Sequence, residues 1–510
     1  MIADSLPFGP GAYAFIGLYL LSLIGIGWLG RRARKDNSLK DFYLGGSGVG
    51  FIVLLLTLYA TQYSGNTLFA FTSKGFSQGY LWLTSVQFMT AILIGFLIYA
   101  PKLYRLARKH SFVTPTDYID RRFKLPALNI LAALIMVVSL GNYFLAQLTA
   151  MGRAIQGLTA AEGAAANNAF IWGVVVLAGI MIVYESLGGF RAVAWTDVIQ
   201  GTVLAIGFAI LLVMIFVKYG APSITTQQLL ATSPEKVLPP TGPDLFKWIS
   251  YIVIFGLGAS LYPHAVQRIY AAKSGKVLRR SMAVMSFMPL ITTLVALLVG
   301  VTAAVYILDI PDGAATETVL TRVMLDIQSG GWFGYCLVVV VFAAILGAIL
   351  STADSALLSV SSMLTKDIYA RFINPKATES SLTKLGKIIS WVLVISLAAL
   401  AIYLNSLGGK KPTLIQIMDL KFDMLVQLAP AFMIGINWKG LRAWPTLLGM
   451  AAGLSIALLM FILPKIDEVE FKWISEIYEL GVHRGLYGLA LNVFIAVGGS
   501  LLLGYRKKAA

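Results

Sequence analysis

Long apolar runs alternate with short polar connections along the whole chain, and no connection is long enough for a separate domain. An α-helix needs about 20 mostly apolar residues to cross the hydrocarbon core of a bilayer. Read in windows of that length, the sequence predicts thirteen membrane-spanning helices and hence an all-α polytopic membrane protein. They cover residues 11–30, 50–73, 79–101, 126–151, 168–187, 192–217, 246–271, 281–308, 332–364, 385–405, 412–436, 443–464 and 485–505.

Two of these spans are interrupted by polar residues, glycine or proline. The second reads FIVLLLTLYATQYSGNTLFAFTSKGF, in which ATQYSGNT competes with helical hydrogen bonding and frees backbone carbonyls. The seventh contains FGLGASLYPHAVQRIY, where Pro263 removes a backbone hydrogen bond. Paired broken helices at matching positions of two halves are typical of inverted-repeat transporters, which bind their solute where the breaks meet. The five-helix separation of the two breaks therefore predicts two five-helix repeats.

We expect one membrane transport domain over residues 1–510. Its predicted parts are an extra N-terminal helix at 11–45, a first repeat at 50–217, a second repeat at 246–436 and C-terminal helices at 443–505. The positions of the two breaks carry this division, because the halves share no repeat at the level of residues.

Composition and charge agree with a membrane protein. The chain is 58% hydrophobic and 13% charged, whereas about a quarter of the residues of soluble proteins are charged. Most of its 40 Lys and Arg residues lie in alternate connections, which places the N-terminus outside and the C-terminus in the cytoplasm. Anionic lipid at the cytoplasmic surface then explains the net charge of +16. We therefore expect membrane lipid as a partner and no nucleic acid.

The ninth span carries an unusual polar stripe within GAILSTADSALLSVSS. Residues three and four apart lie on one helical face, so Ser351, Asp354 and Ser355 point the same way. Such hydroxyls either pack helices closely and bond back to their own helix, or supply oxygen ligands for a small cation together with freed carbonyls. A carboxylate inside a span is by default a functional hypothesis.

Four motifs, ATQYSG, GGFRAVAWTDVIQG, LYPHAVQR and ILSTADSALLSVSSMLTKDIY, follow one another over most of the chain. Together they resemble the sodium:solute symporter family, and its proline, pantothenate and acetate branches in particular. The resemblance implies a leucine-transporter-like fold with one helix before two inverted repeats and further helices after them. It also implies sodium-coupled import of a small organic solute by alternating access, in a bacterial inner membrane, with neither enzymatic activity nor an organic cofactor.

The same resemblance implies a main site for the coupling ion, Na⁺. Its ligands would be the backbone carbonyls of Ala60, Tyr63 and Ala348 and the hydroxyls of Ser351 and Thr352.

A second cation site is the next implication, because some relatives build one at the positions of Ser351, Asp354, Ser355 and Asp197. Those relatives carry a hydroxyl where this chain has Asp354. Asp354 therefore completes such a site, exchanges a proton in a proton-coupled symporter, or pairs with a base or with cytoplasmic water. Asp197 either joins the site or has a capping or other structural role near the start of its helix.

Polar groups near both breaks are candidate contacts for the solute, although each also serves as ordinary glue between helices. They are Gln62, Asn66, Asn142, Gln147, Tyr262, His264 and Gln267. The spacing of His264 and Arg268 after Pro263 resembles the branches named above and favours a small carboxylate or an amino acid. Arg268 alternatively pairs with an acidic side chain. The sequence assigns no role to the charges of MDLKFDM, which we expect to neutralise one another, and gives no indication of the oligomeric state.

Overall fold

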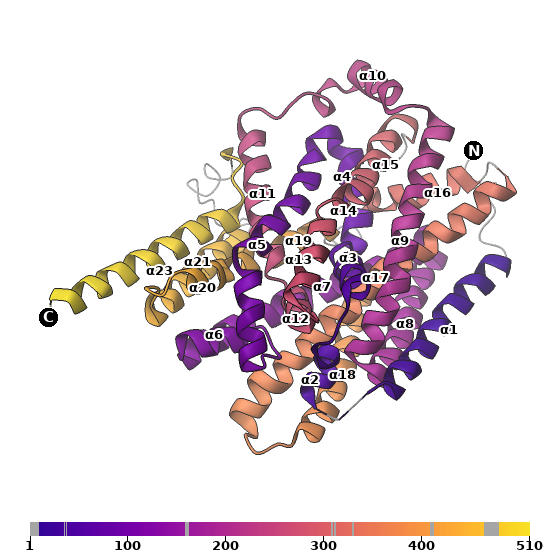
Figure 1. Cartoon of the computed structure of the whole chain (residues 1–510). Coiled ribbons are helices and arrows are strands. Elements are labelled where there is room, and N and C mark those ends of the chain that lie inside the picture. The colour runs from indigo at the N-terminus through magenta and orange to yellow at the C-terminus, as the bar shows by residue number, and fades with distance from the viewer. Residues whose placement is uncertain are drawn as a thin grey trace.

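The computed structural model describes residues 10–509 except 35, 37, 159–162, 308–309, 311–312, 329–330, 408–412 and 464–478. Within these ranges the chain forms helices joined by short turns, and Val49 and Ala272 make an isolated backbone bridge. Figure 1 shows the helices packed side by side in one bundle, with α23 extending from it toward the C-terminus.

Long helices make up most of the bundle. They are α1 (Pro10–Arg32), α5 (Thr84–His110), α7 (Pro126–Leu158), α8 (Gly163–Gly188), α9 (Phe190–Tyr219), α11 (Pro243–Ser260), α15 (Thr293–Tyr306), α17 (Trp332–Met363), α18 (Glu379–Ser406), α21 (Ala443–Ile462) and α23 (Arg484–Ala509).

Shorter elements connect or interrupt them. The shorter α-helices are α2 (Leu39–Leu44), α3 (Phe51–Gln62), α4 (Phe71–Gln78), α6 (Thr116–Phe123), α10 (Pro222–Thr232), α12 (Pro263–Ala271), α13 (Gly275–Met285), α14 (Met288–Ile291), α16 (Val319–Gln328), α19 (Leu414–Leu425) and α20 (Gly435–Asn437). The 3₁₀ and π segments are η1 (Gly45–Ser47), η2 (Asn66–Ala70), η3 (Gly79–Leu83), η4 (Pro234–Lys236), η5 (Gly313–Thr318), η6 (Leu364–Ile373), η8 (Val426–Leu428) and η9 (Pro430–Ile434).

The expected thirteen spans are not confirmed. Among the described residues, ten helices are long and apolar enough to cross a membrane, or eleven if the bent pair α11 and α12 is one span. The difference lies in the second and eleventh predicted spans, where α3 has 12 residues and α19 also has 12. Polar residues and proline interrupt the backbone ladder there, so a run that is continuous in hydropathy is discontinuous as a helix.

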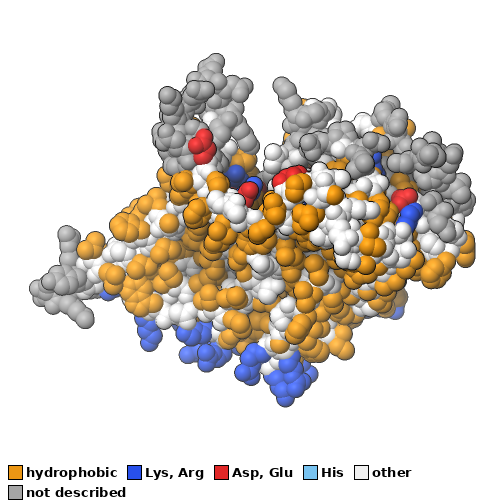
Figure 2. Space-filling model, turned by 90° about the horizontal axis from the view of Figure 1, so that it is seen from above, with side chains coloured by type: hydrophobic (Ala, Val, Ile, Leu, Met, Phe, Trp, Pro, Cys, Tyr) orange, Lys and Arg blue, Asp and Glu red, His pale blue; other side chains and the backbone are white. Residues whose placement is uncertain are grey.

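The surface has the appearance of a membrane protein. Figure 2 shows a broad belt of hydrophobic side chains, with Lys and Arg gathered along the lower edge of the view. Large apolar side chains such as Val217, Phe494 and Leu97 are 82%, 75% and 64% exposed, which suits contact with lipid rather than water.

Helix α17 lies at the centre, and from Val341 to Met363 its side chains are buried. It packs against α7, α9, α18 and α3, and also against α12. The second-span break begins at Tyr63, whose extended backbone (φ −102°, ψ 101°) ends α3. The seventh-span break separates α11 from α12, which are bent by 49°. Both predicted interruptions are therefore present, and both adjoin the central helix.

Candidate functional site

At the break after α3, two backbone amides donate their hydrogen bonds to side chains instead of to backbone carbonyls. The amide of Ser64 donates to the hydroxyl of Thr67 at 3.3 Å, and the amide of Gly65 donates to the side-chain oxygen of Gln147 at 3.0 Å. In a continuous helix these two amides would bond to the carbonyls of Ala60 and Thr61, four residues earlier. Both carbonyls are thereby released for other partners.

Thr352 of α17 faces these released carbonyls. Its hydroxyl oxygen lies 3.4 Å from the carbonyl oxygen of Ala60 and 3.5 Å from that of Thr61. Hydroxyl hydrogen bonds usually span about 2.5–3.0 Å. Ca²⁺, an ion of nearly the size of Na⁺, is held at about 2.3–2.6 Å, so two of its ligands at a right angle are about 3.3–3.7 Å apart. The observed spacing therefore suits two ligands of one small cation better than a hydrogen bond.

The remaining predicted sodium ligands lie on the same two elements. Tyr63 ends the helix that carries Ala60, and Ala348 is buried one turn before Thr352 on α17. The hydroxyl of Ser351 donates to a carboxylate oxygen of Asp197 at 2.5 Å. A hydroxyl that donates its proton keeps lone pairs on oxygen, so Ser351 remains able to ligate a cation.

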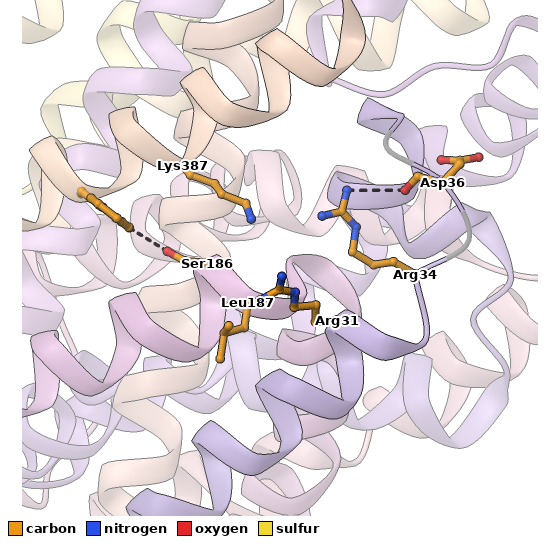
Figure 3. A pocket seen from close by; sticks show the side chains of 7 residues that line it. Arg31, Arg34, Asp36, Ser186, Leu187 and Lys387 are labelled. Carbon is orange, nitrogen blue, oxygen red and sulfur yellow. Dashed lines mark hydrogen bonds between the residues drawn. The ribbon is translucent and has the colours of Figure 1, made fainter.

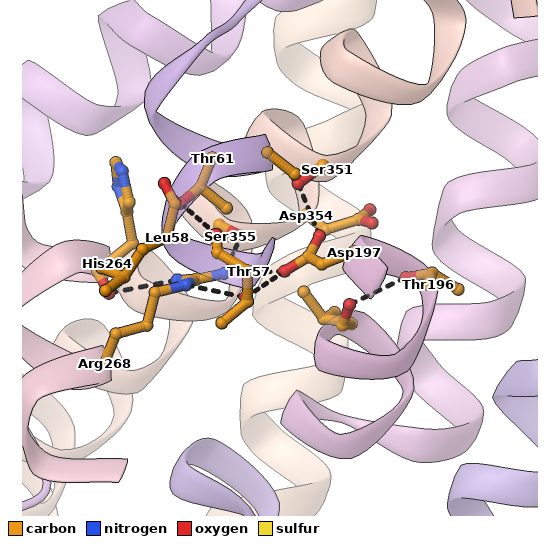
Figure 4. Close-up of polar contacts among 12 residues, drawn as sticks. Thr57, Leu58, Thr61, Thr196, Asp197, His264, Arg268, Ser351, Asp354 and Ser355 are labelled. Atoms are coloured by element: carbon orange, nitrogen blue, oxygen red, sulfur yellow. Dashed lines mark hydrogen bonds and ion pairs between the residues drawn. The ribbon is translucent and has the colours of Figure 1, made fainter. Parts of the chain in front are cut away.

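Beside this position, Asp197 and Arg268 form a buried ion pair (Figure 4). The guanidinium nitrogen Nη2 of Arg268 lies 3.1 Å from the Oδ2 atom of Asp197, and both side chains are sealed from solvent. Thr57 accepts a hydrogen bond from Nε of Arg268 at 2.9 Å and donates its own to Asp197. Nη2 also donates to the hydroxyl of Ser355 at 2.6 Å. A resident cation thus contacts two of the residues expected at a second cation site.

The alternative in which Asp197 caps its helix is wrong. α9 begins at Phe190, so Asp197 lies about two turns inside it, and its carboxylate points toward α17 and α12. The other alternative for Arg268, pairing with an acidic side chain, is confirmed, because that partner is Asp197.

Asp354 lies on α17 in the same region but outside the ion pair. It is 0% exposed and accepts a hydrogen bond from the hydroxyl of Tyr184. Its other oxygen, Oδ1, has no hydrogen-bond partner, and no basic nitrogen lies within 4.0 Å in the described ranges. In this conformation Asp354 thus contacts neither a base nor solvent among the described residues.

Between the two breaks lies a small cavity of about 20 Å³. Two of the predicted solute contacts, Gln62 and Tyr262, line it, together with Ser64, Thr67, Tyr143 and Lys421. Aromatic rings such as Phe422 close its walls. The cavity therefore combines a few polar groups with an apolar lining, as solute sites usually do.

Three of the other predicted contacts hold helices together. Gln147 accepts the amide of Gly65 and so fixes the break. Asn142 donates to the carbonyl of Ile417 at 2.8 Å, which joins α7 to α19. Gln267 accepts from Ser359 at 2.5 Å and donates to a second hydroxyl of α17, which ties α12 to that helix.

His264 and Asn66 complete the set. The ring of His264 stacks on Tyr262 with centroids 4.9 Å apart, and neither of its nitrogens has a hydrogen-bond partner among the described residues. It therefore adjoins the cavity through Tyr262. The side chain of Asn66 lies outside the described residues.

Lys421 is one of the residues of MDLKFDM to which the sequence assigned no role. Its ammonium lies 3.3 Å from the ring centroid of Tyr143, 4.9 Å from that of Phe422 and 5.2 Å from that of Tyr262. Within MDLKFDM, Asp423 bonds to Arg484 at 2.6 Å and not to Lys421, whereas Asp419 attracts the ammonium of Lys421 from beyond contact distance.

The aromatic rings offset only part of the cost of burying Lys421, which is 1% exposed. A cation–π contact contributes about 0.5–2 kcal/mol, whereas removing an ammonium from water costs several kcal/mol even after relaxation. The sequence did not identify Lys421 as a functional residue, because its burial beside a cavity is visible only in the packed structure.

A larger cavity of about 330 Å³ lies near the smaller one and is lined in part by η2, α4 and α19. Ala70 and Ile415 line it, and each is one helical turn from a residue that lines the smaller cavity. Polar side chains, among them Ser73, Lys74 and Glu317, make up much of the rest. The two cavities are separate, and they lie near each other along the second and eleventh predicted spans.

A third cavity, of about 570 Å³, is basic (Figure 3). It lies among the ends of α1 and α8 and the first half of α18, and is lined by Arg31, Arg34, Asp36, Ser186, Leu187, Lys387 and Trp391. Hydrogen bonds from the hydroxyl and amide of Ser38 lower the pKa of the Asp36 carboxyl. The indole of Trp391 donates to Ser186 at 2.7 Å. Tryptophan and clustered basic residues are typical of the membrane interface.

Comparison with known proteins decides the family. The profile of the sodium:solute symporter family matches residues 42–453. The chain belongs to the sodium:solute symporter family. Membership of this family means sodium-coupled symport of a small solute by a multi-pass membrane protein, and not an enzyme, as the motifs indicated.

Two named relatives of this symporter transport proline. It is 26% identical over 458 residues, or 87% of each chain, to the osmoregulated proline transporter OpuE of Bacillus subtilis (strain 168). It is 25% identical over 503 residues, 95% of this chain and 90% of the relative, to the sodium/proline symporter of Staphylococcus aureus (strain JH9).

A solved structure shares its fold. The substrate-bound, outward-open Na⁺-coupled sialic acid symporter matches 97% of this chain and 98% of its own, with a TM-score of 0.75 and 20% sequence identity. The expected leucine-transporter-like fold is therefore confirmed, while the bounds of the two repeats stay a prediction.

Proposed function

We propose that this symporter imports a small carboxylate or amino acid together with one sodium ion. The ion would be held by the carbonyls of Ala60, Tyr63 and Ala348 and the hydroxyls of Ser351 and Thr352. The observation that carries this proposal is the 3.4 Å spacing between the Thr352 hydroxyl and the released carbonyl of Ala60.

Sodium at this position would couple the two transport events. It would bridge the end of α3 to α17, and the solute cavity begins at the same break with Gln62 and Ser64. Binding drives a conformational change only as far as the two states differ in their affinity for sodium. A membrane potential adds about 2.3 kcal/mol per charge for every 100 mV, comparable to a large sodium gradient.

One sodium ion rather than two is supported by Arg268. The second site expected from the motifs would use Asp197, Ser351, Asp354 and Ser355. The guanidinium already bonds to the carboxylate of Asp197 and the hydroxyl of Ser355. A second Na⁺ there would be repelled by this fixed charge.

A second candidate function, proton-coupled symport on the same scaffold, is supported by Asp354. A carboxylate sealed from water without a cation in contact is costly, and a bound proton removes that cost. In either case the protein would lie in a bacterial inner membrane with its N-terminus outside and its C-terminus in the cytoplasm. The Lys and Arg side chains gathered along one edge in Figure 2 support a single cytoplasmic face.

Thermal unfolding of the purified protein in detergent tests the sodium site. Sodium is titrated against potassium at constant ionic strength for the parent, Thr352→Ala and the control Thr202→Ala. The control hydroxyl is exposed and bonds only within its own helix, to the carbonyl of Val198. We expect a saturable, sodium-specific rise of the unfolding temperature in the parent and the control, because a ligand of the native state stabilises it by mass action.

Thr352→Ala should lose this rise. Identical curves in sodium and potassium, with a pH-dependent shift that Asp354→Asn removes, would replace the sodium proposal by the proton-coupled one.

A further inference from the structure

We infer that Lys421 is the group that binds the solute, and that the solute is a small monocarboxylate without an ammonium group of its own. This inference rests on the proposed transport function and selects one of its two solute classes. Its evidence is the position, burial and charge of a side chain to which the sequence motifs assign no role.

Lys421 is positioned as a solute ligand. It lines the small cavity between the two breaks together with Gln62, Ser64 and Thr67 of the broken second span. Its ammonium lies 3.3 Å from the ring centroid of Tyr143, so the ring holds it at the cavity wall. The hydroxyls of Ser64 and Thr67 are within the same lining and are able to donate to an oxygen anion.

The ammonium has no carboxylate in contact. No carboxylate oxygen in the described part of the chain lies within 4.0 Å of its nitrogen. Asp419 is two residues away on α19, and such pairs do not face each other on a helix. Asp423 bonds to Arg484, and Tyr251 donates to Asp419 at 3.3 Å. Asp419 therefore attracts the ammonium only from beyond contact distance, and a carboxylate brought by the solute would supply the negative charge in direct contact.

The other buried cations differ in this respect. Arg268 is paired with Asp197 at 3.1 Å, and Arg153 lies 3.7 Å from Glu317. Arg268, which the motif spacing connected with a carboxylate solute, is therefore already engaged. Lys421 takes over that role.

The lining also selects against amino acids and dicarboxylates. Among the described residues around this cavity, Lys421 is the one charged side chain. An ammonium on the solute would meet no carboxylate there and would lie close to a like charge. A second carboxylate would stay without a cationic partner in an apolar environment, which is costly. A single carboxylate on an uncharged body is the class that satisfies the lining.

The cavity is closed to any solute in this conformation. About 20 Å³ holds a single group of the size of a water molecule. The side chains of Phe71 and Phe422, which line it, must therefore move for a solute to enter.

Ligand-dependent unfolding of the purified full-length protein tests the inference, at fixed sodium concentration and ionic strength. The probes are acetate, propionate, lactate and pyruvate, with lactamide as the neutral counterpart of lactate and with succinate and L-proline as competing classes. The variants are Lys421→Gln, which removes the charge, and Lys421→Arg, which keeps it. Lys273→Gln, a change at an exposed lysine, is the control.

We expect a simple monocarboxylate to stabilise the parent and the control, and lactamide to have no effect. Lys421→Gln should weaken that binding about 30-fold or more, because it removes one partner of a buried charge pair, while Lys421→Arg keeps most of it. Equal binding by the parent and Lys421→Gln would overturn the inference. Stronger stabilisation by L-proline or succinate than by every monocarboxylate would overturn the solute class.

Two comparisons separate this inference from the transport proposal. A sodium-specific rise that persists in Lys421→Gln while carboxylates bind both proteins equally refutes Lys421 and leaves sodium coupling intact. If sodium does not stabilise the parent but monocarboxylates bind to it through Lys421, sodium coupling is refuted and the role of Lys421 is kept. If Lys421→Gln does not unfold cooperatively, the test is made on the parent alone by comparing its stabilisation by lactate and by lactamide. Equal stabilisation by the two would refute a cationic ligand.

Discussion

The guanidinium of Arg268 and the carboxylate of Asp197, 3.1 Å apart, join α12 to α9 next to the central helix α17. Thr57 of α3 bonds to both partners, so the ion pair also reaches the helix that ends at the first break. Ser351, one residue before Thr352, bonds to the same carboxylate. The two broken spans therefore meet in one hydrogen-bonded network directly beside the proposed sodium position.

Removing Arg268 should be strongly destabilising. Arg268→Gln leaves the buried carboxylate of Asp197 without its counterion, which typically costs about 3–5 kcal/mol. The double variant Arg268→Gln/Asp197→Asn should recover part of that loss, because the uncompensated charge is gone and the two sites are coupled. Unfolding in detergent with increasing denaturant measures all three proteins.

An exposed ion pair provides the control for this comparison. Lys218 lies 2.9 Å from Asp326, with both side chains partly exposed, and Lys218→Gln should cost no more than about 1 kcal/mol. Equal losses in Lys218→Gln and Arg268→Gln would mean that the buried pair has no special role in stability.

Sodium should act with a stoichiometry of one. Because Arg268 bonds to Asp197 and Ser355, we expect sodium to activate solute uptake into proteoliposomes with a Hill coefficient of about 1. The sodium dependence of the initial uptake rate at saturating solute measures this value. A coefficient near 2 would show that a second sodium ion binds despite the guanidinium.

The break after α3 should tolerate no side chain at Gly65. A Cβ atom there would lie 2.6 Å from the Cβ of Ala150 and 3.0 Å from Cγ1 of Ile349. We expect Gly65→Ala to lose about 1–3 kcal/mol of stability from overpacking and to weaken the sodium-specific rise of the unfolding temperature. Gly141→Ala on α7 is the control, since nothing lies within 4 Å of its Cβ position and alanine favours a helix. If Gly65→Ala and Gly141→Ala show the same sodium-specific rise of the unfolding temperature, close packing at the break does not position the sodium ligands.

The sequence was sufficient for the features that depend on local chemistry. The run ATQYSGNT and Pro263 both interrupt a helix by changing hydrogen bonds within a few residues, and both interruptions are present. The number of spans was not confirmed for a related reason, because hydropathy does not register that α19 ends at Leu425 while the apolar run continues.

Features that depend on distant pairing were out of reach. Asp197 reads locally as a helix cap, but its partner Arg268 is 71 residues away and on another helix. Lys421 stands between two aspartates in the sequence, yet Asp423 bonds to Arg484, 61 residues away. Only packing reveals which of these neighbouring charges is neutralised and which faces a cavity.

The basic cavity of Figure 3 predicts a dependence on anionic lipid. Arg31, Arg34 and Lys387 surround about 570 Å³ at the predicted cytoplasmic edge, where anionic headgroups contribute about 1 kcal/mol per basic residue. In lipid nanodiscs we expect phosphatidylglycerol to raise the unfolding temperature relative to phosphatidylcholine. The double variant Arg31→Gln/Lys387→Gln should lose most of that gain, because its cavity attracts a phosphate group less strongly.

Two controls show whether this effect belongs to the cavity and to lipid. Lys376→Gln removes an exposed positive charge outside the cavity and should retain the gain, so an equal loss would indicate a general charge effect. Inorganic phosphate added to phosphatidylcholine nanodiscs tests the free ion as the ligand. If phosphate reproduces the stabilisation, the cavity recognises the anion itself; if only the lipid does, the acyl chains along α1 and α18 contribute as well, because burial of their apolar surface adds to the binding of the headgroup.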